Sequence, residues 1–220
     1  MEQGNEILRF VLDNRIVEID FGKQDILPST TVLNYLRSLP GHRGTKEGCA
    51  EGDCGACTVV LGELADGKIH YRAVDSCLLY MPAIHGKQLI TVENLAIRNG
   101  HNIKLHPVQQ AMVENDGSQC GFCTPGFVMA LFALYKSEIE ITRHNVIQAL
   151  AGNLCRCTGY DPIYKAALQC CMNRKPDLFD KQAPEIIKLL VEIRANNSAL
   201  EIRTPKQSYL LPATLQQALD

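Results

Sequence analysis

Short apolar runs separated by turn residues fill the first part of the chain, and this pattern predicts strands. Residues 7–12 and 15–19 form two such runs around Asp13-Asn14, a pair typical of a tight hairpin turn. One helix is expected among the strands, because apolar residues recur at helical spacing over residues 32–39. Further strands are expected at 58–61, 69–74 and 88–92. The pattern therefore predicts a twisted sheet that holds one helix.

From residue 95 to residue 172 the apolar spacing changes to that of helices. Thr124-Pro125 and Asp161-Pro162 each predict an N-cap followed by proline at the first helical position. The expected helices are 107–113, 125–136, 143–150 and 162–172. The fold class predicted for the chain is therefore α+β, with a β-rich part followed by an all-α part.

Prolines interrupt the chain after Arg174, and this loosened composition predicts a linker with one amphipathic stretch at 185–193.

The formal net charge is −2, so nothing favours binding to nucleic acid or to an anionic membrane. No apolar run approaches the ~20 residues of a membrane span, and the first residues lack the regions of an export signal. These features predict a cytoplasmic protein.

Eight of the ten cysteines form two groups, and the other two, Cys170-Cys171, are adjacent, with at least one expected to serve packing. The first group has the C-x4-C-x2-C spacing and a fourth cysteine twenty residues on, which is the plant-type [2Fe–2S] pattern. Its members are Cys49, Cys54, Cys57 and Cys77. Gly48, Gly52 and Gly55 allow the loop to turn its N–H groups toward an anionic cluster.

A zinc site and a disulfide framework both fit the first group less well. Structural zinc sites usually show paired C-x2-C knuckles or Cys/His pairs, which C-x4-C-x2-C does not match. A disulfide framework suits small secreted chains, whereas this chain has 220 residues, 46% of them hydrophobic.

The second group combines a C-x2-C pair with a C-x-C pair more than thirty residues later. Its members are Cys120, Cys123, Cys155 and Cys157. Alone, a C-x2-C pair also suits a thioredoxin-like motif, although no βαβ pattern surrounds it. The C-x-C spacing is too tight for most structural zinc sites. Together the pairs supply four thiolates, each pair beside a helix start whose partial positive charge favours an anionic ligand.

Three segments carry a resemblance to a known family. Residues 48–58, 119–126 and 155–160 resemble the iron–sulfur region of molybdenum hydroxylases, and the match is best with xanthine dehydrogenase small subunits. The resemblance covers about residues 5–172.

The resemblance implies a β-grasp, ferredoxin-like [2Fe–2S] domain over residues 1–92 and an all-α, four-helix [2Fe–2S]-binding domain over 93–173. Each domain would hold one cluster through its own group of four cysteines. Gln119 and Cys157 match positions that contact the molybdopterin of a large catalytic subunit. Residues 174–207 would be a linker, and residues 208–220 resemble the incomplete start of an FAD-binding domain.

The function implied by the resemblance is electron transfer. Two clusters would relay electrons from molybdopterin to FAD and NAD during hydroxylation of xanthine or hypoxanthine in purine catabolism. FAD and molybdopterin would belong to a larger hetero-oligomer that includes a molybdopterin-binding large subunit and an FAD domain. The chain carries no nucleophile–base pair or carboxylate dyad, so it is not expected to be active alone.

Two alternatives remain open. Small subunits of aldehyde oxidases and carbon monoxide dehydrogenases carry the same cysteine pattern, but they typically end soon after the C-R-C motif, whereas this chain continues. A non-redox zinc scaffold would be colourless in the visible, unlike a brown-red [2Fe–2S] protein.

Overall fold

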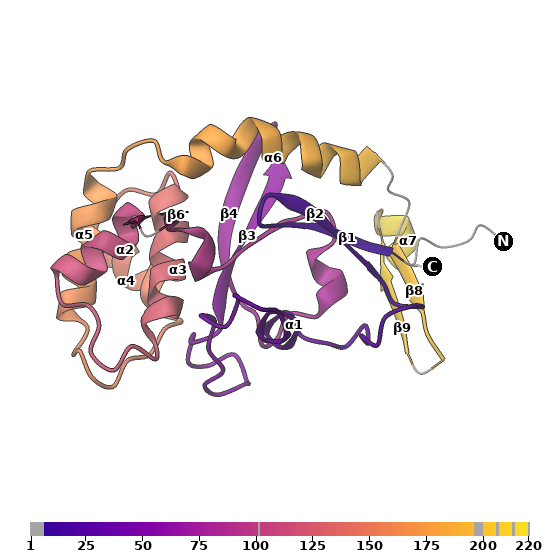
Figure 1. Cartoon of the computed structure of the whole chain (residues 1–220), viewed down its shortest axis with the longest axis horizontal. Coiled ribbons are helices and arrows are strands. Elements are labelled where there is room, and N and C mark those ends of the chain that lie inside the picture. The colour runs from indigo at the N-terminus through magenta and orange to yellow at the C-terminus, as the bar shows by residue number, and fades with distance from the viewer. Residues whose placement is uncertain (1–6, 101, 196–199, 206, 213, 220) are drawn as a thin grey trace.

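A mixed sheet and a group of helices lie side by side, with one long helix crossing above both (Figure 1). This computed structural model describes residues 7–100, 102–195, 200–205, 207–212 and 214–219. Among these residues, no helix combines the length and the apolar character needed to cross a membrane.

The sheet has five strands in the order β2-β1-β5-β3-β4. The strands are β1 (Ile7–Leu12), β2 (Arg15–Asp20), β3 (Thr58–Ala65), β4 (Lys68–Asp75) and β5 (Gln88–Ile90). The pair β1–β5 is parallel and the other neighbouring pairs are antiparallel. The predicted turn between β1 and β2 is present, with φ of 51° at Asp13 and 59° at Asn14, the left-handed values of a two-residue hairpin.

Strand β3 is buried on both faces, which explains its continuous apolar run. Val59 and Leu61 pack with the helix α1 (Val32–Ser38), which Thr31 caps by accepting a hydrogen bond from the Asn34 N–H. Val60 points to the opposite face and joins the core of the helical part. One strand therefore connects the two hydrophobic cores.

The helical part consists of α2 (Pro107–Glu114), α3 (Thr124–Lys136), α4 (Arg143–Leu150) and α5 (Asp161–Met172). Helix α3 is apolar around most of its circumference because α2, α4 and α5 contact it and it also packs on β3 and β4. Phe127 and Phe132 are fully buried at its centre. Both Cys170 and Cys171 are buried in this core, at 5% and 2% exposure, so both serve packing.

Two of the predicted helix caps are wrong by one residue. The N-caps of α3 and α5 are Cys123 and Tyr160, so that Thr124 and Asp161 are already helical. The hydroxyl of Thr124 lies 2.7 Å from the hydroxyl of Ser118 and does not accept a hydrogen bond from an N–H of α3. Helix α4 is capped by Thr142, which accepts a hydrogen bond from the Asn145 N–H at 3.2 Å. Proline is accepted at the first and at the second position of a helix. The Thr-Pro and Asp-Pro pairs therefore do not fix which residue is the N-cap.

The segment predicted as a linker contains an eighteen-residue helix, α6 (Leu178–Ala195), with Pro184 inside it. Ile186, Leu190 and Ile193 are buried against the sheet, in a cluster with Val11. At its start, Phe179 packs on Phe132 of α3 with ring centroids 4.7 Å apart. The amphipathic stretch is therefore a helix that braces both parts of the fold.

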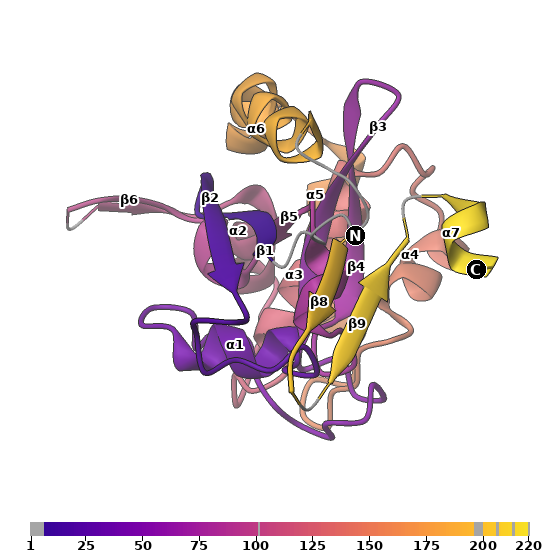
Figure 2. The same ribbon diagram turned by 90° about the vertical axis from the view of Figure 1, so that its right-hand side faces the viewer.

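Small elements complete the fold. They are the 3-10 helices Met81–Ile84 and Val92–Asn94, the hairpins β6 (Ile97–Asn99) with β7 (Asn102–Lys104) and β8 (Leu200–Arg203) with β9 (Ser208–Leu211), and α7 (Leu215–Leu219). The β6 hairpin projects from the body (Figure 2). Leu200 and Ile202 of β8 are buried in the same core as α1, so the end of the chain folds back on the sheet.

Candidate metal centres

The first cysteine group begins on the loop between α1 and β3. The N–H groups of Asp53 and Cys54 point at the Cys49 sulfur, at 3.3 and 3.4 Å, and the Cys49 N–H points at the Cys54 sulfur at 3.4 Å. Backbone donation from Glu51, Asp53 and Cys54 lowers the pKa of Cys49 to about 7. Donors that stabilise a thiolate suit a soft metal ligand, because the thiolate is the form that binds metal.

The other half of the first group is buried at the end of a hairpin. Cys57 precedes β3 and Cys77 follows β4, and the register that pairs Thr58 with Asp75 brings the two sulfurs to 3.3 Å. Cys57 and Cys77 are 3% and 8% exposed and pack beside Leu33 of α1. Burial raises the pKa of Cys57 to about 12, and the neighbouring Cys77 and Asp75 oppose its ionisation further. A bound cation would instead favour the thiolate form of Cys57.

Two glycines shape this loop for close approach. A Cβ at Gly48 would lie 2.7 Å from the Cys54 sulfur. Gly52 has φ of +77°, and a Cβ there would lie 2.3 Å from a methyl carbon of Leu78. Glycine at both positions therefore lets the loop fold closely around the Cys54 sulfur and against Leu78, as a loop that wraps an anionic cluster requires.

The second group lies at the ends of α3, α4 and α5. Cys123 is the N-cap residue of α3, and its thiol contacts that of Cys155. The thiols of Cys120 and Cys157 form another contacting pair. Burial, with the adjacent Cys155, raises the pKa of Cys123 to about 12. Burial also opposes ionisation of Cys155, but donation to its sulfur, chiefly from Thr158, outweighs this and lowers the pKa to about 7.

Each group therefore consists of two pairs of thiols. Two thiolates per iron is the arrangement that a two-iron cluster with four cysteine ligands requires, so the donor set fits such a cluster. Among the described residues, no set of three or more His, Cys, Asp or Glu side chains gathers at one mononuclear metal position.

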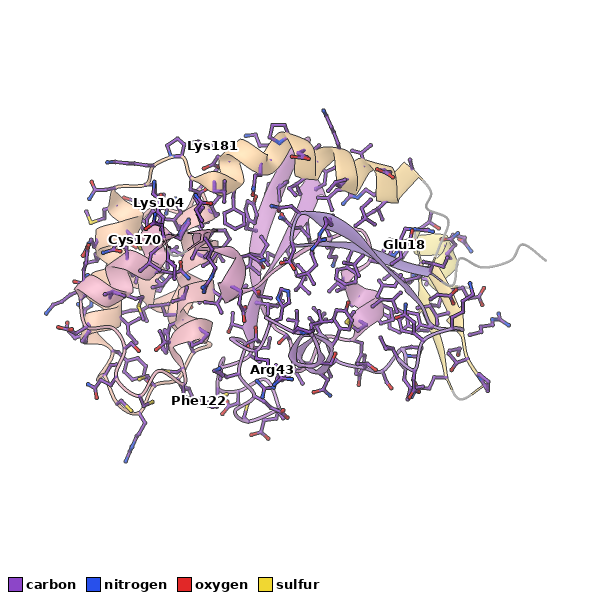
Figure 3. All side chains as sticks on the ribbon, in the orientation of Figure 1. Glu18, Arg43, Lys104, Phe122, Cys170 and Lys181 are labelled. Atoms are coloured by element: carbon purple, nitrogen blue, oxygen red, sulfur yellow. The ribbon has the colours of Figure 1, made fainter. Side chains whose placement is uncertain are left out.

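The second group opens to the surface while half of the first is enclosed. Cys120, Cys157 and Gln119 are exposed. A hollow surrounds the second group, lined by its four cysteines and by Phe122, Leu154, Arg156 and Tyr160. Phe122 lies at the edge of the molecule where the loops of both parts meet, near the loop that carries Arg43 (Figure 3), and its ring is 3.6 Å from the Cβ position of Gly48.

Sequence reasoning missed the residues that support the sulfurs from behind. Thr158 donates its hydroxyl to Cys155 at 3.2 Å, and a threonine three residues after a cysteine was a local signal for this bond. Asn153 bonds to the loop of the first group, 98 residues away in sequence. No local pattern reveals a contact at such a separation.

The different thiol pKa values predict an order of alkylation in the cluster-free chain. At pH 7 the thiolate fraction should be much larger for Cys49 and Cys155, whose pKa is lowered, than for Cys57 and Cys123, whose pKa is raised. Iodoacetamide should therefore modify Cys49 and Cys155 first, with rates that level off above about pH 8. Mass spectrometry of timed samples measures the order, and equally fast modification of Cys57 would contradict it.

Comparison with known proteins identifies a family for the helical part of the chain. The family model described as a [2Fe-2S] binding domain matches residues 91–168. The chain is 42% identical over 173 residues to aldehyde oxidase 2 of Cavia porcellus, and 43% identical over 169 residues to xanthine dehydrogenase of Emericella nidulans. These alignments cover 77% and 76% of the chain but 12% of each relative, so the chain spans about an eighth of their length.

A solved structure shows the same relationship. The aldehyde oxidoreductase of Desulfovibrio desulfuricans matches with a TM-score of 0.61 and 30% identity, over 74% of this chain and 17% of that one. The cysteine groups, the matched [2Fe-2S] domain and the named relatives agree. The chain therefore belongs to the molybdenum hydroxylase family and corresponds to its iron–sulfur region.

Proposed function

We propose that the chain is the electron-transfer component of a xanthine dehydrogenase and carries two [2Fe–2S] clusters. The observation that carries this proposal is the arrangement of eight cysteines as two sets of paired thiols on two adjoining parts of one fold. When bound, each cluster would supply one-electron redox chemistry, which lets a two-electron oxidation at molybdenum reach a distant flavin one electron at a time.

The first cluster would be held by Cys49 and Cys54 on one side and Cys57 and Cys77 on the other. Support comes from the strand order β2-β1-β5-β3-β4 with α1 on one face, which we assign to a β-grasp, ferredoxin-like domain. The residues of this chain exclude water from the Cys57 side and donate N–H groups on the Cys49 side. Burial and sulfur hydrogen bonds are the means by which a protein sets a cluster's potential.

The second cluster would be held by Cys120 with Cys157 and by Cys123 with Cys155, at the end of the four helices α2 to α5. Cys123 is the N-cap residue of α3, so this group lies at the positive end of the helix dipole, which favours an anionic cluster. The exposure of Gln119, Cys120 and Cys157 supports their placement against the molybdopterin of a partner domain. That partner, an FAD domain and a hetero-oligomeric assembly in the cytoplasm are parts of the same proposal.

Two substrate classes occur among the named relatives. Relatives named aldehyde oxidase and xanthine dehydrogenase are equally similar to the chain, at 42% and 43% identity. This equality makes an aldehyde oxidase the second candidate. We keep xanthine or hypoxanthine as the first candidate substrate because the three cysteine-bearing segments resemble xanthine dehydrogenase small subunits.

Substrate reduction of the natural complex tests this choice. Anaerobic xanthine should bleach the visible absorption of the clusters within the turnover time, and an aromatic aldehyde should do so more slowly. Bleaching by the aldehyde alone would replace xanthine dehydrogenase by aldehyde oxidase and leave the electron-transfer role standing.

A further inference from the structure

The two cysteine loops touch each other directly, although they belong to different parts of the fold. Gly55 follows Cys54 on the first loop, and a Cβ at Gly55 would lie 2.3 Å from the carbonyl oxygen of Gly152. Gly126 lies in the first turn of α3, and a Cβ there would lie 2.1 Å from the carbonyl oxygen of Gly55. Both positions require glycine, because real Cβ atoms do not approach oxygen so closely.

Hydrogen bonds join the loops at the same place. The N–H of Leu154 donates to the carbonyl oxygen of Cys54 at 3.0 Å, so one bond connects the residue before Cys155 to a cysteine of the first group. The side-chain amide of Asn153 donates to the carbonyl oxygen of Gly55 at 2.9 Å and lies 3.1 Å from the Thr58 hydroxyl oxygen. The Thr58 hydroxyl in turn donates to the Gly55 oxygen at 2.7 Å.

The Asn153 amide is well placed to hold this contact rigid. Asn153 is 5% exposed and Thr58 is also 5% exposed, so water does not compete for these bonds. The backbone N–H of Asn153 donates to the Leu150 oxygen at 2.9 Å, which fixes the residue to the end of α4. Loss of the side-chain amide would remove the only side-chain bond that reaches from the second loop to the Gly55 oxygen among the residues that the structure describes.

We infer that Asn153 is a positioning residue that locks the two cysteine-bearing loops to each other and so fixes the spacing of the two clusters. The part that concerns the clusters rests on the proposed function. Magnetic interaction and electron exchange between two centres both fall steeply with distance. A loosened contact between the loops would therefore weaken the interaction without removing any of the eight cysteines.

Three variants of the full chain separate this role from general stability. Asn153→Ala removes the amide. Gly126→Ala leaves Asn153 intact but places a methyl group against the Gly55 oxygen, although helix propensity alone favours alanine at this position. The control is Asn145→Ala, since Asn145 also donates its amide to a backbone oxygen, that of Glu140, away from both cysteine groups.

The first measurement is hydrogen exchange at the Leu154 amide in the protein as isolated anaerobically, read by mass spectrometry with residue-level fragmentation. We expect about tenfold faster exchange in Asn153→Ala and Gly126→Ala, the scale of one lost hydrogen bond, and no change in Asn145→Ala. The second is the paramagnetic resonance of the fully reduced protein. The splitting or relaxation enhancement between the two signals should shrink in the first two variants, with wild-type iron content.

Wild-type exchange and wild-type magnetic interaction in both Asn153→Ala and Gly126→Ala would overturn the inference. If a variant binds less iron, the exchange at Leu154 still decides the role of Asn153. Wild-type protein without iron would instead refute the proposed function, and the exchange measurement would judge the contact between the loops independently.

Discussion

Replacing Cys54 by serine should remove the first iron–sulfur signal and leave the second intact. Serine offers an oxygen in place of a soft thiolate, and it also loses the sulfur that accepts the Cys49 N–H. Iron content should fall from about four to about two atoms per chain, the number in one [2Fe–2S] cluster. Paramagnetic resonance of the reduced protein, with iron analysis of the same sample, measures both effects.

Two further variants control this result. Cys155→Ser should give the mirror outcome, with the second signal lost and the first retained. Cys170→Ala alters a thiol that is buried in the helical core outside both groups, so both signals should persist. Loss of both signals in Cys54→Ser, or of neither, would contradict the assignment of the cysteines to separate centres.

Replacing Asp177 should destabilise the fold strongly. Its carboxylate lies 2.9 Å from the His106 ring nitrogen and 3.1 Å from the Lys136 ammonium, and the three side chains are 3% to 7% exposed. Asp177→Ala would leave the buried Lys136 with the half-exposed Asp180 as its remaining carboxylate partner among the described residues, which costs roughly 3–5 kcal/mol. Urea unfolding at pH 7 measures the change.

The Asp177 carboxylate also caps the start of helix α6. Asp177 accepts from the Asp180 N–H at 3.1 Å, and Asp180 accepts from the Asp177 N–H at 2.8 Å, an arrangement like a capping box. Asp177→Asn keeps a capping side chain and should therefore cost less than Asp177→Ala. Lys165→Ala, which breaks the exposed Lys165–Asp161 pair, is the control and should change stability by less than about 0.5 kcal/mol.

The effect of Asp177 should also depend on pH. Burial opposes its ionisation, but the His106 and Lys136 partners outweigh burial and hold the pKa of Asp177 well below its ordinary value. A lowered folded pKa stabilises the protein above the unfolded value of about 3.9, and this stabilisation is lost as pH falls through the folded pKa. The difference between wild type and Asp177→Asn should therefore be full at pH 7 and narrow below about pH 4. A difference that grows on acidification would contradict this origin.

The sequence predicted features that depend on neighbouring residues. The Asp13-Asn14 turn and the strands around it are present because each depends on backbone conformations and bonds within a few residues. The cysteine spacing predicted which thiols form the first group, since C-x4-C-x2-C and the hairpin that ends at Cys77 are also local. The ligand assignment itself stays a prediction.

Features that depend on distant contacts were not predictable. Pro184 suggested a linker, but burial of Ile186, Leu190 and Ile193 against the sheet stabilises α6 through it, and only the folded sheet provides that surface. Asn153 had no recognisable motif because its partner Gly55 comes from the other part of the fold. Tertiary packing decided both cases.

The central claim is that eight thiolates hold two two-iron clusters. Its most direct test is analysis of the anaerobically isolated or reconstituted chain for iron and acid-labile sulfide, together with paramagnetic resonance after reduction. We expect about four iron and four sulfide per chain, as in two [2Fe–2S] clusters, and two distinct signals. Protein that binds zinc, or that contains no acid-labile sulfide after reconstitution, would contradict it.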